Sequence, residues 1–149
     1  MVMERMRRLC PAQEGPREWH HTDEVAGSEH RQHPRFIVTA LGMTIAVRSL
    51  LGDDQVRARL INVSLGGCCI ALPAAQAQTL VDSGACRCAL PVGIGRSSVD
   101  YPAAVAGWRR PDPDRDREHY VHLCFNRVSP HQSTLLARWM ATLPATCAW

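Results

Sequence analysis

The sequence contains no lysine, few aromatic residues and no long hydrophobic run. All 17 of its basic residues are arginine, and against 14 acidic residues they leave a formal charge of only +3 over 149 residues. This charge is too low for a polybasic binder of DNA, RNA or membranes. Aromatic residues make up 5% of the chain, which argues against a surface that stacks on single-stranded bases. No segment approaches the roughly 18 consecutive apolar residues of a transmembrane helix, so we expect no membrane insertion.

Cysteine occurs seven times, but without the spacing of a functional site. No Cys-x-x-Cys pair occurs, which argues against a zinc ribbon and a redox dithiol. Met1–Ala12 carries arginines but lacks the apolar run of a secretory signal. We therefore expect a cytoplasmic protein whose cysteines are small buried hydrophobic residues. No nucleophile and base stand at the spacing of an enzyme, so we expect neither catalysis nor a metal or other cofactor.

Hydrophobic periodicity divides the chain into three parts. Residues 1–29 have no sustained apolar period and contain Gly15 and Gly27, which is typical of a flexible arm. Residues 30–143 form the expected folded domain, because apolar residues recur there at regular spacing. Residues 144–149 are the expected tail. Hydrophobic residues make up 46% of the chain, which is enough for a domain of this size to bury a core.

Short runs of β-branched and apolar residues predict an all-β domain. The expected strands are Phe36–Ala40, Met43–Leu51, Val56–Ile61, Cys68–Leu72, Cys86–Val92, Ser98–Arg110 and His119–Phe125. The alanine- and glutamine-rich segment Pro73–Val81 predicts one helical turn or a long crossover. Ser129 and Pro130 have the sequence of a helix N-cap and first helical position, and the apolar stripe Leu135–Leu143 predicts an amphipathic helix after them. We therefore predict a small antiparallel β-barrel with a C-terminal α-helix as its lid.

Two polar motifs lie at the boundaries of the first predicted strands. The first, Arg31-Gln-His-Pro-Arg35, places two arginines four residues apart where the arm meets the domain. Pro34 disfavours a helix at His33, so we expect this motif to be extended. The second motif, Asn62-Val-Ser-Leu-Gly-Gly67, is a polar turn between two strands. The arginine pair alone is a weak signal, whereas the Asn-x-Ser-x-x-Gly string is rarer by chance. Their order and their placement at strand boundaries make the pair of motifs more specific still.

Together the motifs resemble those of the PilZ family, bacterial receptors for the dinucleotide cyclic di-GMP. The family pattern is R-x-x-x-R followed by [D/N]-x-S-x-x-G, and the resemblance covers residues 30–143. The residues that match the pattern are Arg31, Arg35, Asn62, Ser64 and Gly67. The resemblance implies that these residues bind cyclic di-GMP, with His30 and Gly66 as further candidates. It also implies a non-enzymatic receptor that acts on a downstream protein to control motility, exopolysaccharide production or biofilm formation.

The residue types suit this ligand chemically. Guanine presents O6 and N7 as paired acceptors, which an arginine fork satisfies with two hydrogen bonds. Guanidinium groups also bind phosphate and stack on purine faces. Asn62 and Ser64 supply neutral hydrogen-bonding groups, and Gly67 allows a sharp turn or a close approach of the backbone.

The chain departs from the family pattern at three positions. Asn62 stands where many members have aspartate, and it keeps an acceptor without the charge. His30 stands where many members have a further arginine, a position linked to the number of ligands bound. His122 stands in the last strand where the family often has glycine. Trp108, in contrast, lies in an apolar strand and is expected in the core.

We expect ligand binding to order the arm, because Arg31 and Arg35 lie at its junction with the barrel. Three other functions stay open. The first is a PilZ-like protein-interaction adaptor that works without nucleotide. The second is a barrel that binds RNA or single-stranded DNA, which the low charge and few aromatic residues disfavour. The third is an enzyme that uses cysteine and histidine.

Overall fold

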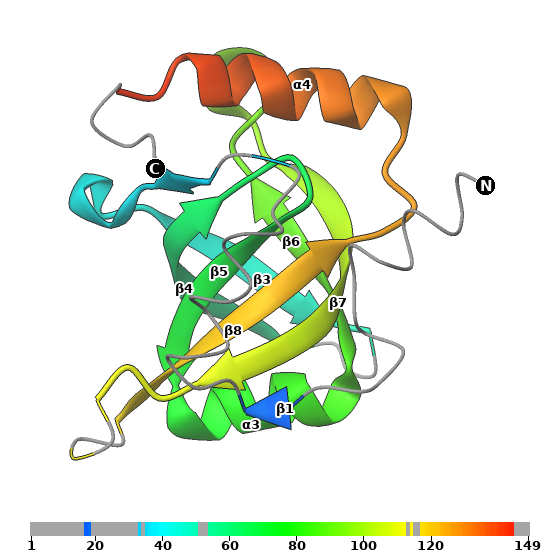
Figure 1. Ribbon diagram of the computed structural model, residues 1–149. Helices are drawn as coiled ribbons and strands as arrows, with labels where there is room; N and C mark the ends of the chain where they lie inside the picture. The colour runs from blue at the N-terminus through cyan, green and yellow to red at the C-terminus, as the bar shows by residue number, and fades with distance from the viewer. Residues whose placement is uncertain are drawn as a thin grey trace.

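Six strands of the computed structural model, which describes residues 17–18, 33, 35–50, 54–112, 114 and 117–144, close into an antiparallel barrel (Figure 1). The strands are β3 (Thr44–Ser49), β4 (Gln55–Val63), β5 (Gly67–Pro73), β6 (Ala85–Leu90), β7 (Val99–Arg109) and β8 (Glu118–Phe125). Around the barrel they follow the order β3-β4-β5-β8-β7-β6, and β6 pairs back to β3. The predicted β-barrel is confirmed, and these strands begin and end within about two residues of their predicted limits.

The interior of the barrel is filled by apolar side chains that alternate along the strands, as a pleated sheet requires. Buried residues such as Val47, Leu60, Ile70 and Leu90 come from four different strands and belong to one core cluster. Trp108 packs against this core and stacks on His119, with ring centroids 4.9 Å apart. The prediction that Trp108 is a core residue is therefore confirmed.

Two helices cover the two ends of the barrel (Figure 1). Helix α4 (Pro130–Ala141) begins with a capping box, in which the Ser129 hydroxyl accepts a hydrogen bond from the Gln132 backbone and the Gln132 side chain accepts one from the Ser129 backbone. Leu136, Trp139 and Met140 on α4 are buried, so the predicted helical lid is confirmed.

Helix α3 (Ala74–Ser83) covers the opposite end and is longer than the single turn expected for this segment. Its alanine- and glutamine-rich sequence has a high helix propensity. The helix ends at Gly84, which has the left-handed backbone conformation (φ 74°) that suits glycine after a helix.

The first predicted strand, Phe36–Ala40, is shorter in the structure. Strand β2 contains only Phe36–Ile37 and is followed by a 3₁₀ turn, η2 (Thr39–Leu41), and by Gly42 with φ 62°. The reason is geometric. Strands β2 and β3 pair with successive parts of the same edge of β4, so the chain must turn between them.

Two arm residues also form a strand, where the sequence predicted a flexible arm. Strand β1 (Arg17–Glu18) pairs in parallel with Gly107 and Trp108 of β7. The pairing of β6 with β7 ends at Ala104, which leaves the rest of that edge of β7 open to β1. The Glu18 carboxylate also forms an ion pair with Arg110 at 3.0 Å.

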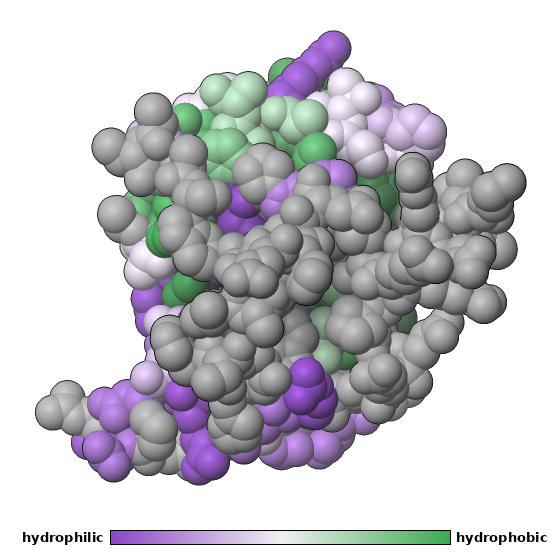
Figure 2. Space-filling view, in the orientation of Figure 1, coloured by the Kyte–Doolittle hydropathy of each residue, from purple (hydrophilic) through white to green (hydrophobic). Residues whose placement is uncertain are grey.

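The surface differs between the two ends of the barrel. In Figure 2, hydrophilic residues gather around the β7–β8 connection, whereas hydrophobic residues gather at the end that carries α4. The β6–β7 connection contains a second 3₁₀ turn, η3 (Ile94–Arg96), in which Ile94 is 96% exposed. Within the part of the chain that the structure describes, no helix has the length and apolar character needed to span a bilayer.

Candidate functional site

A bulge in β4 brings Asn62 to the outer side of the barrel. Leu60 and Val63 both face the core, and the register with β5 shifts between Leu60 and Asn62. Ile61 and Asn62 therefore both lie on the outer surface, with Asn62 in register with Ile37 of β2 and Cys69 of β5. Bulges commonly redirect a side chain near a functional site. The amide of Asn62 thus stands where β2, β4 and β5 meet.

Ser64 organises the turn that follows. Its backbone N–H donates to the Gly67 carbonyl at 2.8 Å, and its hydroxyl donates to the same carbonyl at 3.4 Å. The hydroxyl also accepts a hydrogen bond from the backbone N–H of Gly66 at 3.2 Å. Ser64 is 8% exposed. Since these bonds leave one lone pair of the hydroxyl, Ser64 holds the turn in shape and keeps one acceptor for a ligand.

The two glycines of the motif differ in the space that the structure leaves for a side chain. A Cβ atom at Gly67 would lie 2.0 Å from the Leu123 carbonyl oxygen of β8, so the close pairing of β5 with β8 requires glycine there. A Cβ atom at Gly66 would lie 3.4 Å from Cδ2 of His33, an ordinary contact. The sequence predicted a sharp turn at Gly67 or a close approach of its backbone to the ligand. The structure shows a close approach to β8, and the approach to the ligand stays a prediction.

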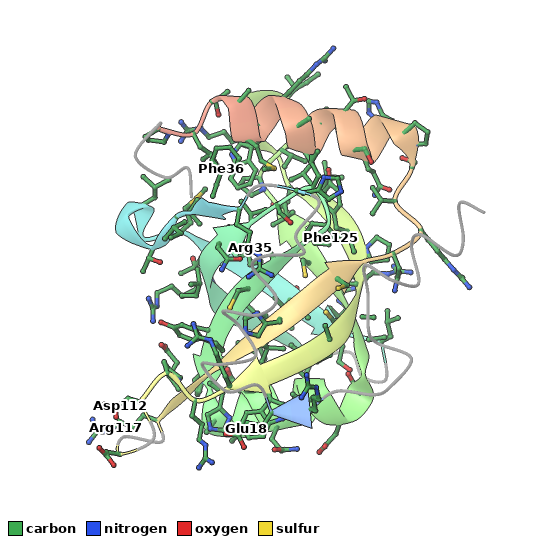
Figure 3. The ribbon with its side chains drawn as sticks, in the orientation of Figure 1. Glu18, Arg35, Phe36, Asp112, Arg117 and Phe125 are labelled. Atoms are coloured by element: carbon green, nitrogen blue, oxygen red, sulfur yellow. The ribbon has the colours of Figure 1, made fainter. Side chains whose placement is uncertain are left out.

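The arm reaches the turn through β2. Phe36 is in register with Val63, so Arg35, one residue earlier, lies beside Ser64. The His33 ring lies close to Gly66 of the same turn, since a Cβ atom added at Gly66 would be 3.4 Å from its Cδ2 atom. Figure 3 shows the half-buried Arg35 over the outer surface of the barrel, while Phe36 lies nearer α4. The structure therefore brings one arginine of the first motif to the second motif, whereas Arg31 and His30 lie outside the described residues.

An apolar cluster adjoins the turn on what we call the front wall, the outer side of β5, β8 and residues 59–63 of β4. Ile61, Cys69 and Ala71 form this separate hydrophobic cluster, and Tyr120 packs against it. The three side chains are buried, with exposed fractions of 7%, 1% and 3%, whereas Tyr120 at the edge of the cluster is half-buried. An aromatic edge of this kind suits the flat face of a base beside a guanidinium group.

The front wall also holds charged side chains that the sequence reasoning did not single out. The Arg109 guanidinium lies over the Tyr120 ring, 4.6 Å from its centroid, in a cation–π contact. Arg59 forms an ion pair with Glu118. His122 is 4% exposed and lies across from Cys69 and Gly107. The alternation of polar and apolar residues in β8 was the one sequence signal that marked this outer face.

The chemistry of this site is that of binding. It combines a guanidinium, an amide, a hydroxyl and an apolar surface, which together suit a flat, anionic ligand with hydrogen-bonding edges. Among the residues that the structure describes, no group of three or more histidine, cysteine or acidic side chains is placed to hold a metal ion.

The fold resembles those of several solved proteins. The PilZ domain of YcgR from Escherichia coli, determined with c-di-GMP, is 17% identical, with a TM-score of 0.55 over 76% of this chain and 90% of that one. MrkH of K. pneumonia, in its c-di-GMP complex, is 14% identical, with a TM-score of 0.57 over 74% of this chain and 50% of that one. PlzA of Borreliella burgdorferi, in complex with c-di-GMP, is 11% identical, with a TM-score of 0.53 over 81% of this chain and 57% of that one.

The chain thus spans half the length of MrkH and 57% of the length of PlzA. A comparison with curated protein sequences finds no match. The sequence model of the PilZ domain matches residues 29–142, which is most of the chain. The barrel, its helical lid and this match lead to one conclusion: the chain belongs to the PilZ domain family.

Proposed function

We propose that this protein is a receptor for cyclic di-GMP and binds it at the junction of β2 with the Asn62–Gly67 turn. The observation that carries the proposal is the position of Arg35 beside Ser64, which joins the two halves of the family motif in one place. The PilZ proteins of known structure that it resembles were determined with the same dinucleotide. Their function supports the assignment of this ligand.

Each residue of the site has a role that follows from its chemistry. Arg31 and Arg35 bind a guanine edge or a phosphate, because a guanidinium fork matches both. Asn62 hydrogen-bonds to guanine from the outer side of the bulge, and Ser64 offers its remaining acceptor. Gly66 and Gly67 keep the turn low enough for a ligand to approach. His30 adds a group that can stack on a base.

We further propose that binding orders the arm and thereby changes the surface offered to a downstream protein. The protein acts without catalysis, as an adaptor in the control of motility, exopolysaccharide production or biofilm formation. The ligand is the signal, and no metal or other cofactor takes part. The proposal includes Arg31, since the arm must close over the ligand for its position to report binding.

Titration calorimetry with cyclic di-GMP tests this function. Arg35→Ala and Arg31→Ala are each expected to weaken binding about 100-fold, because each removes charge-assisted hydrogen bonds to the ligand. Arg117→Ala is the matched control, since Arg117 is exposed in the β7–β8 connection (Figure 3), at the far end of the barrel from the site. Unchanged affinity in both motif variants would refute the proposal. A wild-type chain that gives no heat of binding would favour a nucleotide-independent adaptor.

A further inference from the structure

A row of exposed arginines crosses the side of the barrel opposite the front wall. Arg57 of β4, Arg48 of β3 and Arg87 of β6 lie on three adjacent strands and point outward. We call this surface, made by the outer faces of β3, β6 and residues 55–57 of β4, the back wall. Neighbouring strands are about 4.8 Å apart. Arg57 is in register with Ala46, two residues along β3 from Arg48, so the three side chains form a diagonal basic strip.

The strip places like charges opposite each other. Arg48 and Arg87 are direct partners in the pairing of β3 with β6, an arrangement that destabilises an antiparallel sheet. Arg57 donates a hydrogen bond to the Thr44 hydroxyl at 2.9 Å. Among the described residues, no carboxylate lies within ion-pair distance of these three arginines. The back wall therefore carries a local excess of positive charge, which the Asp100 carboxylate near Arg48 and Arg87 offsets only in part.

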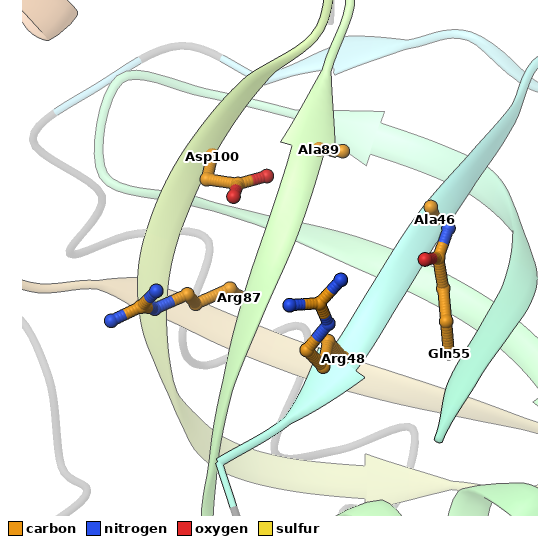
Figure 4. Close-up of a pocket in the computed structure, with 6 residues that line it drawn as sticks. All are labelled: Ala46, Arg48, Gln55, Arg87, Ala89 and Asp100. Atoms are coloured by element: carbon orange, nitrogen blue, oxygen red, sulfur yellow. The ribbon is translucent and has the colours of Figure 1, made fainter. Parts of the chain in front are cut away.

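A shallow recess lies within the strip. Its lining combines Arg48 and Arg87 with Gln55, Asp100 and the paired alanines Ala46 and Ala89. The alanines keep the floor low, so a side chain from outside has room between the arginines. In Figure 4 the guanidinium of Arg48 faces the recess, while that of Arg87 extends away from it across β7. The two charges therefore stand side by side and do not converge on one small anion.

We propose that the back wall binds an acidic segment of a partner protein, whose carboxylates pair with Arg57, Arg48 and Arg87. Separated guanidinium groups match the spaced carboxylates of a polypeptide, and arginine binds carboxylates with two hydrogen bonds. Gln55 and Asp100 accept hydrogen bonds from backbone or side-chain donors of the same segment.

The surface is poorly suited to nucleic acid. Strands β3, β4 and β6 contain no aromatic residue on which a base can stack. Asp100 also stands in the recess, where a phosphodiester backbone has no hydrogen-bond donor to offer its carboxylate, whereas a polypeptide has its backbone N–H groups. Both features favour an acidic protein segment, which brings donors as well as carboxylates.

A receptor needs a surface that binds its downstream partner, separate from its ligand site. The back wall is such a surface, and its role in signalling rests on the proposed function. Around the barrel, β3 lies opposite β8, and β6 lies opposite β5. A partner on β3 and β6 therefore leaves the Asn62–Gly67 turn accessible. Ligand and partner are expected to bind the same molecule at the same time.

Fluorescence anisotropy with a fluorescein-labelled peptide of alternating glutamate and alanine tests the surface on the full chain. The double variant Arg48→Gln/Arg87→Gln is expected to weaken peptide binding about tenfold or more. The control Arg117→Gln/Arg138→Gln, which removes the same number of charges from exposed sites outside the back wall, is expected to leave it unchanged. Because the double variant removes facing like charges, its Tm is expected to rise by about 1–3 °C.

Three results would overturn the inference. One is an equal loss of peptide binding in Arg117→Gln/Arg138→Gln, which would show a non-specific charge effect. Another is a fall in the Tm of the double variant, which would show that the pair stabilises the sheet. A third is a wild type that ignores the peptide but binds a mixed-sequence single-stranded oligonucleotide through Arg48 and Arg87.

A parallel calorimetric titration with cyclic di-GMP separates the two proposals. The double variant is expected to bind the dinucleotide as the wild type does, since its substitutions lie across the barrel from the turn. If the dinucleotide fails to bind while the peptide binding depends on Arg48 and Arg87, the receptor proposal fails and the back wall stands. If the dinucleotide binds and the peptide does not, the reverse holds.

Discussion

The front wall and the back wall of the barrel carry arginine in opposite ways. On the front wall, Arg59 pairs with Glu118 and Arg109 lies over Tyr120. On the back wall, Arg48 stands across from Arg87, and within the described chain neither has a carboxylate partner. Arg59 and Arg109 on the front wall thus each have a partner side chain, whereas the facing arginines of the back wall repel each other.

The difference shows what each surface is prepared to bind. On the front wall the arginines are held by partner side chains, so the specificity of ligand binding depends on a few other groups, such as Asn62 and Arg35. A wall with excess charge gains free energy when an acidic partner neutralises it. The first arrangement favours recognition of one small ligand, and the second favours a protein surface of complementary charge.

The largest expected effect concerns the backbone beneath the front wall. Gly67→Ala is expected to lower the free energy of unfolding by about 3 kcal/mol, because the new Cβ would overlap the Leu123 carbonyl of β8. Gly66→Ala is the control, since its Cβ meets only the His33 ring at contact distance. Urea unfolding measures both variants, and equal stabilities would contradict the close approach of β5 to β8.

Buried thiols lie in the core between the strands of the two walls: Cys68 on β5, and Cys86 and Cys88 on β6. A hydrogen bond with Cys88, together with burial, raises the pKa of the Cys86 thiol, and a hydrogen bond with Cys68 is the main cause of the raised pKa of Cys88. The unfolded chain ionises these thiols near pH 8.5, while the folded chain keeps them neutral. The contribution of these thiols to the free energy of unfolding is therefore constant below that pH. Above it, the contribution falls by up to about 1.4 kcal/mol per pH unit for each thiol.

Urea unfolding between pH 7 and pH 10 measures this slope. Cys86→Ala removes one of the thiols and is expected to flatten the fall above about pH 8.5. A variant that keeps the full slope would show that the Cys86 thiol does not cause the pH dependence of the free energy of unfolding.

The walls are also expected to differ in how they respond to the loss of an amide. Asn62→Ala is expected to weaken cyclic di-GMP binding about tenfold, because it removes a hydrogen-bonding group from the proposed site. Gln55→Ala removes an exposed amide from the back wall and is expected to change the affinity less than about twofold. Calorimetry compares the two, and similar losses would mean that ligand binding is not confined to the front wall.

The smallest expected effect concerns α4, the helix that covers one end of the barrel. Ser129→Ala removes the N-cap of α4 and is expected to cost about 1 kcal/mol of stability. Since α4 covers the end of the barrel, the affinities for cyclic di-GMP and for the acidic peptide are expected to stay the same. A selective loss of one affinity in this variant would instead connect the lid with that wall.

Local sequence signals predicted much of the fold. The strands followed from alternation, and the start of α4 followed from Ser129 and Pro130, because these preferences act within a few residues. The Asn62–Gly67 turn could also be predicted, because its residue types favour a turn locally. The strand proposed at Phe36–Ala40 was too long, since its end depends on how β2 and β3 share one edge of β4.

Features that depend on distant segments were not visible. The pairing of β1 with β7 joins residues far apart in the chain and involves only Arg17 and Glu18 on one side. The Arg48–Arg87 pair likewise requires the register of β3 with β6. The bulge that brings Asn62 outward has no local signature, because it appears only as a shift against β5.

The short strand β1 has a consequence for the free energy of ligand binding. Arg17 and Glu18 are held on β7 by strand pairing and by the ion pair of Glu18 with Arg110. Ordering a residue costs conformational entropy, and residues that are already paired add nothing to the cost of the ordering proposed on ligand binding. Glu18→Ala removes the ion pair and is expected to raise that cost at a distance from the binding site.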